Sequence, residues 1–314
     1  MADHRQIDFG HNIDSFEREI LDDINDKLEP YIQMSMEERY YLNGIVRKAK
    51  PKKILEIGTA LGGSAALLLN ATRNIDGAKV LSLDYSTQCY IMPEKQTGWI
   101  VPELFPELAK RWEFHGGGCV CQYLEGGGGG FDLLLLDTVH SNPGEFLNIL
   151  EALPYLKDGA IVVLHDTSQW TTWGKELQCT NQILLSTLKG KRILFDDAAC
   201  PVIPCIGGIV LDKIDHDMLW GLFTNIALPW VNSLPYIDYV TLARYFDQHY
   251  DRDLVDIFKR SAIWHRQRDL LIAEVRMQNQ TPLLERQHGL FSAMIQFIRR
   301  IKSKCRCILT TRKL

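Results

Sequence analysis

Short apolar runs alternate with helical stretches through the middle of the chain. The runs cover residues 53–58, 79–84, 131–137, 160–166, 192–196 and 207–212. Continuous apolar strands separated by helices are typical of a parallel sheet that is buried on both faces. The pattern therefore predicts an α/β fold, with a doubly wound, mostly parallel sheet and helices on both faces.

Helical periodicity surrounds this central part. Phe16, Ile20, Ile24 and Leu28 recur at helical spacing, which predicts N-terminal helices within residues 1–50. We expect the sheet domain to occupy residues 51–212. A helical C-terminal extension is predicted over residues 213–314.

Twenty uncharged residues, 218–237, follow the last predicted strand. Their number would allow a membrane crossing. However, Pro229, Pro235 and several polar side chains interrupt the stretch, and backbone exposed to lipid must stay hydrogen-bonded. We interpret it as a packed helix followed by an aromatic loop. That loop is interpreted as either a dimer contact in a homo-oligomer or a substrate lid.

Composition narrows the class of protein. Of 314 residues, 46% are hydrophobic and 24% are charged, and the net charge is −4, which gives no reason to expect a nucleic-acid partner. Eight cysteines are scattered along the chain, and the N-terminus is polar. These features favour a cytoplasmic protein with reduced thiols.

Four acids stand at or near the ends of predicted strands: Glu56, Asp84, Asp137 and Asp166. Ligands of doubly wound sheets bind beyond the carboxyl ends of the strands. The sequence therefore predicts an acidic rim around a ligand site.

The stretch from Gly58 to Gly63 is a glycine turn between a strand and a helix. A dinucleotide fingerprint would place its middle glycine at Ala60, and Glu56 would bring negative charge towards a pyrophosphate. A cationic ligand, S-adenosylmethionine, suits Glu56 better. Asp84 then lies at about the ~20-residue distance expected of an acid that binds ribose hydroxyls. An NAD-type oxidoreductase remains the alternative on the same fold.

The residues also carry a family resemblance. "EIGTALGGS" followed by "SLDYS" resembles the first two motifs of class I S-adenosylmethionine-dependent methyltransferases. Residues 131–167 resemble a branch that includes catechol O-methyltransferase-like enzymes, macrolide-sugar O-methyltransferases and cephalosporin-hydroxylase-like proteins. The resemblance covers residues 35–212. It implies a Rossmann-like fold and methyl transfer from S-adenosylmethionine.

The chain departs from that branch at several positions. Thr138 replaces a usual glycine, and His165 stands where many metal-dependent relatives have another acid. Residues 113–132 are unusually rich in glycine, so the resemblance places the adenine contact only loosely, near Gly118 and Cys119. The predicted cofactor-binding residues are Glu56, Gly58, Thr59, Gly62, Ser64, Asp84, Tyr85, Gly118, Cys119 and Asp137.

A hydroxyl group is a poor nucleophile until its proton is removed or its oxygen binds a metal, so the expected methyl transfer needs a base or a metal ion. His140 is the candidate general base, and Asp137, three residues before it, is the second candidate catalytic residue. Asp137 and Asp166 suit Mg²⁺, and His165 is a candidate third metal ligand. The alternatives are a surface or helix-capping role for His140 and a core role for His165.

The end of the chain is strongly basic. After Glu285 there are no acids and eight Lys or Arg residues, with apolar residues at helical spacing. Such a helix can lie on an anionic membrane surface, and the alternative is a docking helix with a basic tail. We expect an O-methyltransferase acting on a sugar, a glycan or another hydroxylated small molecule. A catalytically silent binding or assembly subunit is the alternative from another class.

Overall fold

A computed structural model describes residues 4–10, 12–126, 128–168, 179–195, 205–231 and 233–275. Its centre is a seven-stranded sheet with the order β3-β2-β1-β4-β5-β7-β6. The strands are β1 (Lys53–Ile57), β2 (Lys79–Asp84), β3 (Trp112–Gly116), β4 (Phe131–Leu136), β5 (Leu156–His165), β6 (Gly190–Ile193) and β7 (Ile206–Leu211).

The sheet is mostly parallel, as predicted. β1, β2, β3, β4 and β5 pair in parallel, whereas β7 pairs antiparallel with both β5 and β6. The strand order reverses between β1 and β4. β2 and β3 lie on one side of β1, and β4 and the later strands lie on its other side. Ligands of such sheets bind beyond the carboxyl ends of the strands at this point.

The apolar runs predicted every strand except β3. β3 carries Glu113 and His115 and is only partly buried, because it is the edge strand of the sheet. β6 ends at Ile193, earlier than predicted, and residue 196 lies outside the described residues.

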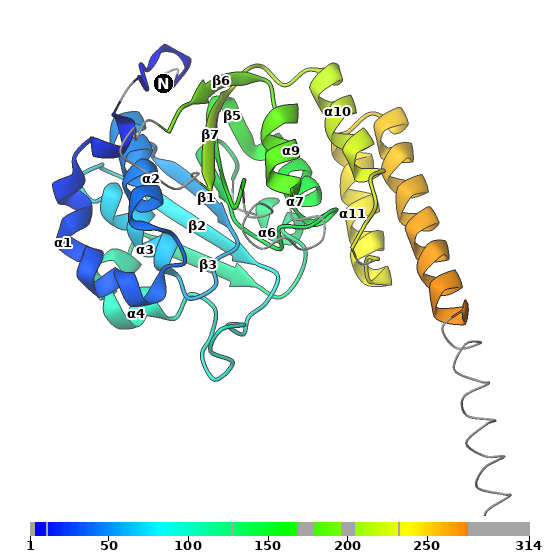
Figure 1. The fold of residues 1–314 in the computed structure, drawn as a ribbon, viewed down its shortest axis with the longest axis horizontal. Helices are drawn as coiled ribbons and strands as arrows, with labels where there is room; N and C mark the ends of the chain where they lie inside the picture. The colour runs from blue at the N-terminus through cyan, green and yellow to red at the C-terminus, as the bar shows by residue number, and fades with distance from the viewer. Residues whose placement is uncertain are drawn as a thin grey trace, which may run out of the picture. The chain divides into compact units, whose positions relative to one another are not determined.

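Helices cover both faces of the sheet (Figure 1). One face carries α1 (Arg18–Leu28), α2 (Met36–Ala49), α3 (Gly63–Ala71), α4 (Ile100–Leu104) and α5 (Pro106–Ala109). The other face carries α6 (Cys121–Leu124), α7 (Gly144–Ala152), α9 (Thr180–Thr187), α10 (His216–Ile226) and α11 (Tyr236–His249). Short 3₁₀ turns occupy His4–Gln6, Ile13–Ser15, Glu29–Tyr31 and Leu153–Tyr155.

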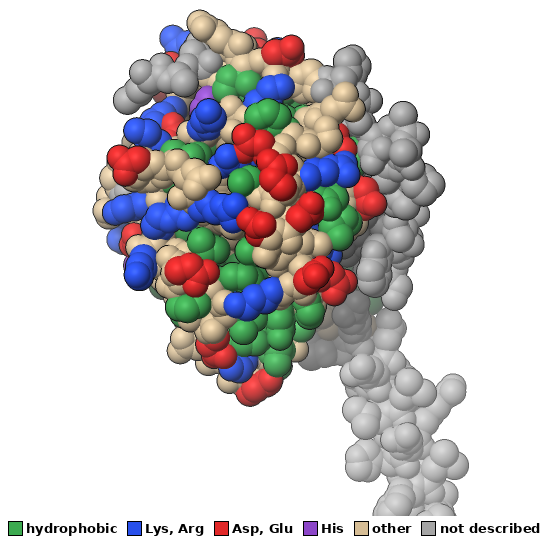
Figure 2. Space-filling model, turned by 90° about the vertical axis from the view of Figure 1, so that its left-hand side faces the viewer, with side chains coloured by type: hydrophobic (Ala, Val, Ile, Leu, Met, Phe, Trp, Pro, Cys, Tyr) green, Lys and Arg blue, Asp and Glu red, His purple; other side chains and the backbone are tan. Residues whose placement is uncertain are grey.

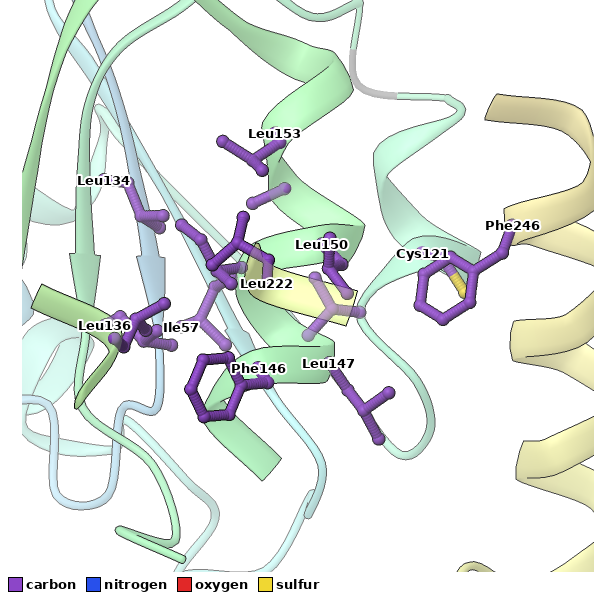
Figure 3. Packing of buried hydrophobic residues seen from close by; sticks show 14 of the residues in the cluster. Ile57, Cys121, Leu134, Leu136, Phe146, Leu147, Leu150, Leu153, Leu222 and Phe246 are labelled. Atoms are coloured by element: carbon purple, nitrogen blue, oxygen red, sulfur yellow. The ribbon is translucent and has the colours of Figure 1, made fainter. Parts of the chain in front are cut away.

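Alternate residues of each central strand enter two separate cores, because successive side chains of a strand point to opposite faces. Leu134 and Leu136 of β4 pack towards α7, whereas Leu133 and Leu135 pack towards α2 and α3. Figure 3 shows α7 between the sheet and α11, with Phe146 directed at the strands. A sheet that is apolar on both faces needs both helical layers, which is why this sequence gives three layers.

The first C-terminal helices contribute to the core on the α7 side of the sheet. Leu222 of α10 and Phe246 of α11 belong to the same buried cluster as α7, and so do Leu254 and Phe258 of a helix over residues 252–275. By contacts the chain divides into residues 1–262 and 263–314. Among the described residues, none of the helices combines the length and the apolar character that a membrane crossing requires. The basic tail after Glu285 lies outside the described residues.

Charges of both signs are mixed on the side of the molecule drawn at the left of Figure 1. Figure 2 shows Lys and Arg side chains interspersed with Asp and Glu side chains on that face. Neither sign forms a continuous surface in this view.

Candidate active site

The glycine turn follows β1 directly and is held against the neighbouring strands. The backbone N–H of Gly58 donates to the Leu83 carbonyl at 2.8 Å, and that of Asp137 donates to the Ile57 carbonyl at 2.9 Å. Gly58 has a φ of +90°, and a Cβ on it would lie 1.7 Å from the Asp137 carbonyl oxygen. Only glycine fits a positive φ and so close a backbone approach.

Asp84 closes the turn from the end of β2. Its Oδ2 accepts the backbone N–H of Thr59 at 2.9 Å, and its Oδ1 accepts that of Ser86 at 2.9 Å. The carboxylate remains partly exposed. Each carboxylate oxygen has two lone pairs, so Asp84 can still accept hydroxyl groups from a ligand.

Glu56 is placed differently from Asp84. It is fully buried, and its Oε1 accepts the Ser64 hydroxyl at 2.6 Å, while its Oε2 accepts the hydroxyls of Ser82 and Thr59. Burial raises the pKa of Glu56 to about 7 against these hydrogen bonds. Glu56 and Ser64 therefore tie α3 to the strands, and their direct contact with a cofactor stays a prediction.

The residues predicted for the adenine end lie beside Asp84. Gly117 N–H donates to the Asp84 carbonyl at 3.2 Å, and Gly118 and the buried Cys119 follow it. Tyr85 is 62% exposed, and its hydroxyl donates to Asp238 Oδ2 of α11 at 2.9 Å. This contact with the C-terminal extension was not expected from the sequence.

Asp137, His140 and Asp166 come together after β4 and β5. His140 Nε2 lies 2.9 Å from Asp166 Oδ2 and 3.7 Å from Asp137 Oδ1. His140 and Asp166 both have a φ of +57°. Non-glycine residues in this left-handed region are uncommon, and they cluster at functional sites.

The charges within this cluster shift the pKa values of His140 and Asp166. Burial lowers the pKa of His140, but the hydrogen bond with Asp166 and the charge of Asp137 outweigh it, so the pKa lies above its ordinary value. Burial raises the pKa of Asp166, but hydrogen bonds with His140 and His165 outweigh it and hold the pKa well below its usual range. The site therefore favours positive charge between two carboxylates.

His165 is buried behind the same carboxylates. Its Nδ1 lies 3.3 Å from Asp137 Oδ2 and 3.4 Å from Asp166 Oδ2, and its Nε2 lies 3.4 Å from Glu38 Oε2. The neighbouring carboxylates raise the pKa of His165 well above its ordinary value although burial lowers it. Glu38 also closes the capping box of α2 with Ser35.

Two acids of this arrangement were missed in the sequence. Ser35 and Glu38 have the spacing of a capping box, which explains Glu38 without any role near His165. Glu145 lies in an apolar helical stretch five residues after His140, and its His140 N–H contact could have been suspected only from that proximity.

The linker between α10 and α11 lies against the loop that carries His140. Asn142 Nδ2 donates to the Leu228 carbonyl at 2.8 Å, and the Val231 N–H donates to the Asn142 carbonyl at 3.0 Å. The linker thus borders the candidate site. The dimer-contact and lid interpretations both stay predictions.

A divalent cation fits the cluster. Asp137, His140 and Asp166 each offer a ligand atom, and these three atoms lie within 4.8 Å of one another. Two carboxylate oxygens and an imidazole nitrogen form a reasonable donor set for a divalent metal. The cluster includes His140, while His165, the predicted third ligand, approaches the same carboxylates from the buried side.

One segment of the chain matches a known protein family. Residues 55–167 match a family described as a methyltransferase domain. This segment runs from β1 to the residue after Asp166 and includes most of the candidate site. No curated protein matches the chain by sequence.

Several solved structures are similar. They include an SAH-bound methyltransferase from Podospora anserina (17% identity, TM-score 0.45, covering 62% of this chain and 88% of that one). An O-methyltransferase from Bacillus cereus in complex with SAH has 17% identity and a TM-score of 0.42, over 62% of this chain and 89% of that one. A putative O-methyltransferase from Klebsiella pneumoniae has 17% identity and a TM-score of 0.43, over 65% and 91%.

The strand order, the glycine turn after β1 and the matched segment agree with one another. Residues 55–167 match a methyltransferase-domain family, and the chain has a Rossmann-like fold, with a seven-stranded, mostly parallel sheet between helices.

Proposed function

We propose that this protein transfers a methyl group from S-adenosylmethionine to a hydroxyl oxygen of a small molecule. The observation that carries the proposal is the adjacency of two features at one sheet edge. The glycine turn follows β1, and the Asp137–His140–Asp166 cluster follows the neighbouring strands β4 and β5. In-line methyl transfer needs a nucleophile held against the donor.

The cofactor end of the site is built by β1 and β2. S-adenosylmethionine supplies an electrophilic methyl group when bound. The side-chain-free surface at Gly58 allows close approach of a ligand, and the partly exposed Asp84 carboxylate would accept its ribose hydroxyls. Tyr85 offers an exposed ring at the same end.

The acceptor end supplies the base. A hydroxyl is a poor nucleophile until its proton is removed. His140 Nε2 can take that proton, and Asp166 and Asp137 stabilise the resulting imidazolium. We propose a sugar or another hydroxylated small molecule as acceptor, on the resemblance of residues 131–167.

The same three residues would hold a divalent cation such as Mg²⁺. A bound cation would orient the acceptor oxygen and lower the pKa of its hydroxyl. In this version His140 is a metal ligand. Methyl transfer from labelled S-adenosylmethionine to a panel of sugars and phenols, with and without EDTA, separates the two versions. Full activity in EDTA leaves His140 as a metal-free base.

Calorimetry with S-adenosylhomocysteine, S-adenosylmethionine and NAD tests the cofactor. We expect S-adenosylhomocysteine to bind and to raise the melting temperature. Asp84→Ala should weaken that binding by about tenfold or more, because it removes a charged acceptor worth roughly 1.5–3 kcal/mol. The exposed Asp76, in the loop before β2, provides a control, and Asp76→Ala should bind normally. Tight NAD binding without any S-adenosylhomocysteine binding would establish the oxidoreductase instead.

A further inference from the structure

Asp238 is a buried carboxylate in the C-terminal extension, next to the loops that we expect at the adenosine end of the site. It lies in the first turn of α11 and is 8% exposed. Its Oδ2 accepts the Tyr85 hydroxyl at 2.9 Å, and its side chain also hydrogen-bonds with the Cys119 thiol. A carboxylate is costly to bury unless hydrogen bonds compensate for the lost water. These two donors therefore help to keep Asp238 in its buried position.

The two donors come from the ends of different strands. Tyr85 follows Asp84 at the end of β2, and Cys119 follows the glycines after β3. Burial and the charges of Glu151 and Asp238 raise the pKa of the Cys119 thiol, so the thiol keeps the proton that it donates. Asp238 thus ties together the loops that carry two of the predicted cofactor-binding residues.

The ring of Tyr85 is exposed although its hydroxyl is held. The side chain is 62% exposed, and the hydrogen bond to Asp238 raises the pKa of the phenol. The exposed ring stands directly after Asp84, the carboxylate expected to bind the ribose. Nucleic-acid bases stack on aromatic side chains. A ring that is already held in place loses less conformational freedom when a ligand binds.

We propose that Asp238 is a positioning residue for the cofactor. It holds the Tyr85 ring and the Cys119 loop beside the adenine base, so that the C-terminal extension completes the adenosine end of the site. The inference rests on the proposed function, because the ligand is S-adenosylmethionine. Asp238 lies outside residues 55–167, so the match to the methyltransferase-domain family gives it no role.

A purely structural contact between α11 and the β2 loop is the competing explanation. Tyr245 provides a matched control, because it also lies on α11 and its hydroxyl donates to the Glu151 carbonyl of α7 at 2.6 Å. Tyr245→Phe and Tyr85→Phe remove the same atom from two contacts of α11. Only the second of these contacts involves a predicted cofactor-binding residue.

Calorimetry on the full chain tests the proposal with S-adenosylhomocysteine and with 5′-methylthioadenosine, which keeps the adenosine but lacks the amino-acid half. We expect Tyr85→Phe and Asp238→Ala each to weaken the binding of both ligands by about two- to tenfold, because the ring must then be ordered on binding. The double variant should bind about as weakly as Asp238→Ala, because both changes break one contact. Tyr245→Phe should bind both ligands as the wild type does.

Melting temperatures of the same samples show which variants are folded. Asp238→Asn keeps an oxygen that can accept the Tyr85 hydroxyl and should recover part of the affinity. If Asp238→Ala does not fold, Tyr85→Phe and Asp238→Asn carry the comparison.

The possible failures are distinguishable. Normal binding of both ligands by folded Tyr85→Phe and Asp238→Ala would reduce the contact to a structural one and leave the proposed function in place. An equal loss of affinity in Tyr245→Phe would also overturn the inference, because it would show that any loosening of α11 weakens binding. A wild type that binds neither ligand would overturn the proposed function, and this inference with it.

Discussion

Acidic residues at the carboxyl edge of this sheet have different roles. Glu56 is the last residue but one of β1 and Asp84 is the last of β2, yet Glu56 is buried among three hydroxyls and Asp84 stays partly exposed. Both side chains lie on the same face of the sheet, because Glu56 pairs with Ser82, two residues before Asp84. Glu56, however, lies inside its strand and is covered by Ser64 of α3. Asp84 is the last residue of β2, where its carboxylate accepts the backbone N–H groups of Thr59 and Ser86 in two loops.

Gly58 offers a test of how tightly that turn is built. Gly58→Ala should reduce the free energy of unfolding by roughly 3 kcal/mol or more, because its Cβ would meet the Asp137 carbonyl and its φ is positive. Gly77 has a φ of +69° with open space around it, so Gly77→Ala should cost only about 1 kcal/mol. Urea unfolding measures both. Equal losses would show that the turn can move away from Asp137.

Glu151 predicts how stability depends on pH. Burial raises its pKa to about 7 from the ordinary 4.5. The folded state therefore holds a proton that the unfolded state releases between these values, and stability falls as pH rises through that range.

Glu151→Gln removes this dependence. Relative to wild type, the variant should gain up to about 3 kcal/mol of unfolding free energy between pH 4.5 and pH 8, since one pKa unit corresponds to about 1.4 kcal/mol. Urea unfolding across this pH range measures the difference. Parallel stability curves for the two proteins would mean that Glu151 ionises normally in the fold.

At the scale of elements, the C-terminal extension contacts the loops around the site. The Tyr85 hydroxyl links the end of β2 to Asp238 near the start of α11, although the two residues lie far apart in sequence. Such a bond stabilises a protein only modestly when one partner is exposed.

A double-mutant cycle measures this contact. Tyr85→Phe and Asp238→Asn should each destabilise the protein, with a coupling of about 0.5–1 kcal/mol between them. The unfolding free energies of both single variants and the double variant supply the coupling. Additive effects would show that α11 is held by its apolar face alone, through residues such as Phe246.

At the scale of the whole molecule, the basic tail lies far in sequence from residues 55–167, which match the methyltransferase family. Membrane contact through residues 286–314 stays a prediction. A chain that ends at Val275 should keep its melting temperature and its binding of S-adenosylhomocysteine. It should lose the pelleting with anionic vesicles that we expect of the full chain at low salt, and salt should weaken that pelleting. Failure of the full chain to pellet would leave the docking-helix interpretation.

Much of the fold could be predicted from local patterns. The apolar runs gave six of the seven strands, because strands buried on both faces are continuously hydrophobic. β3 was not predicted, because an edge strand carries polar residues such as Glu113 and His115. The glycine turn and the rim acids could be found because both follow directly from strand ends.

By itself, the sequence determined which residue types end each strand, and so the class of fold and the edge where chemistry is placed. Only the tertiary structure decided which acids meet which histidines. Glu38 and His165 lie 127 residues apart in the chain and are paired by the packing of α2 on the sheet. Glu145 reaches His140 because the loop after β4 turns back over the first turn of α7. Local patterns arise from neighbours in the chain, whereas these contacts depend on layers that close only when the whole domain folds.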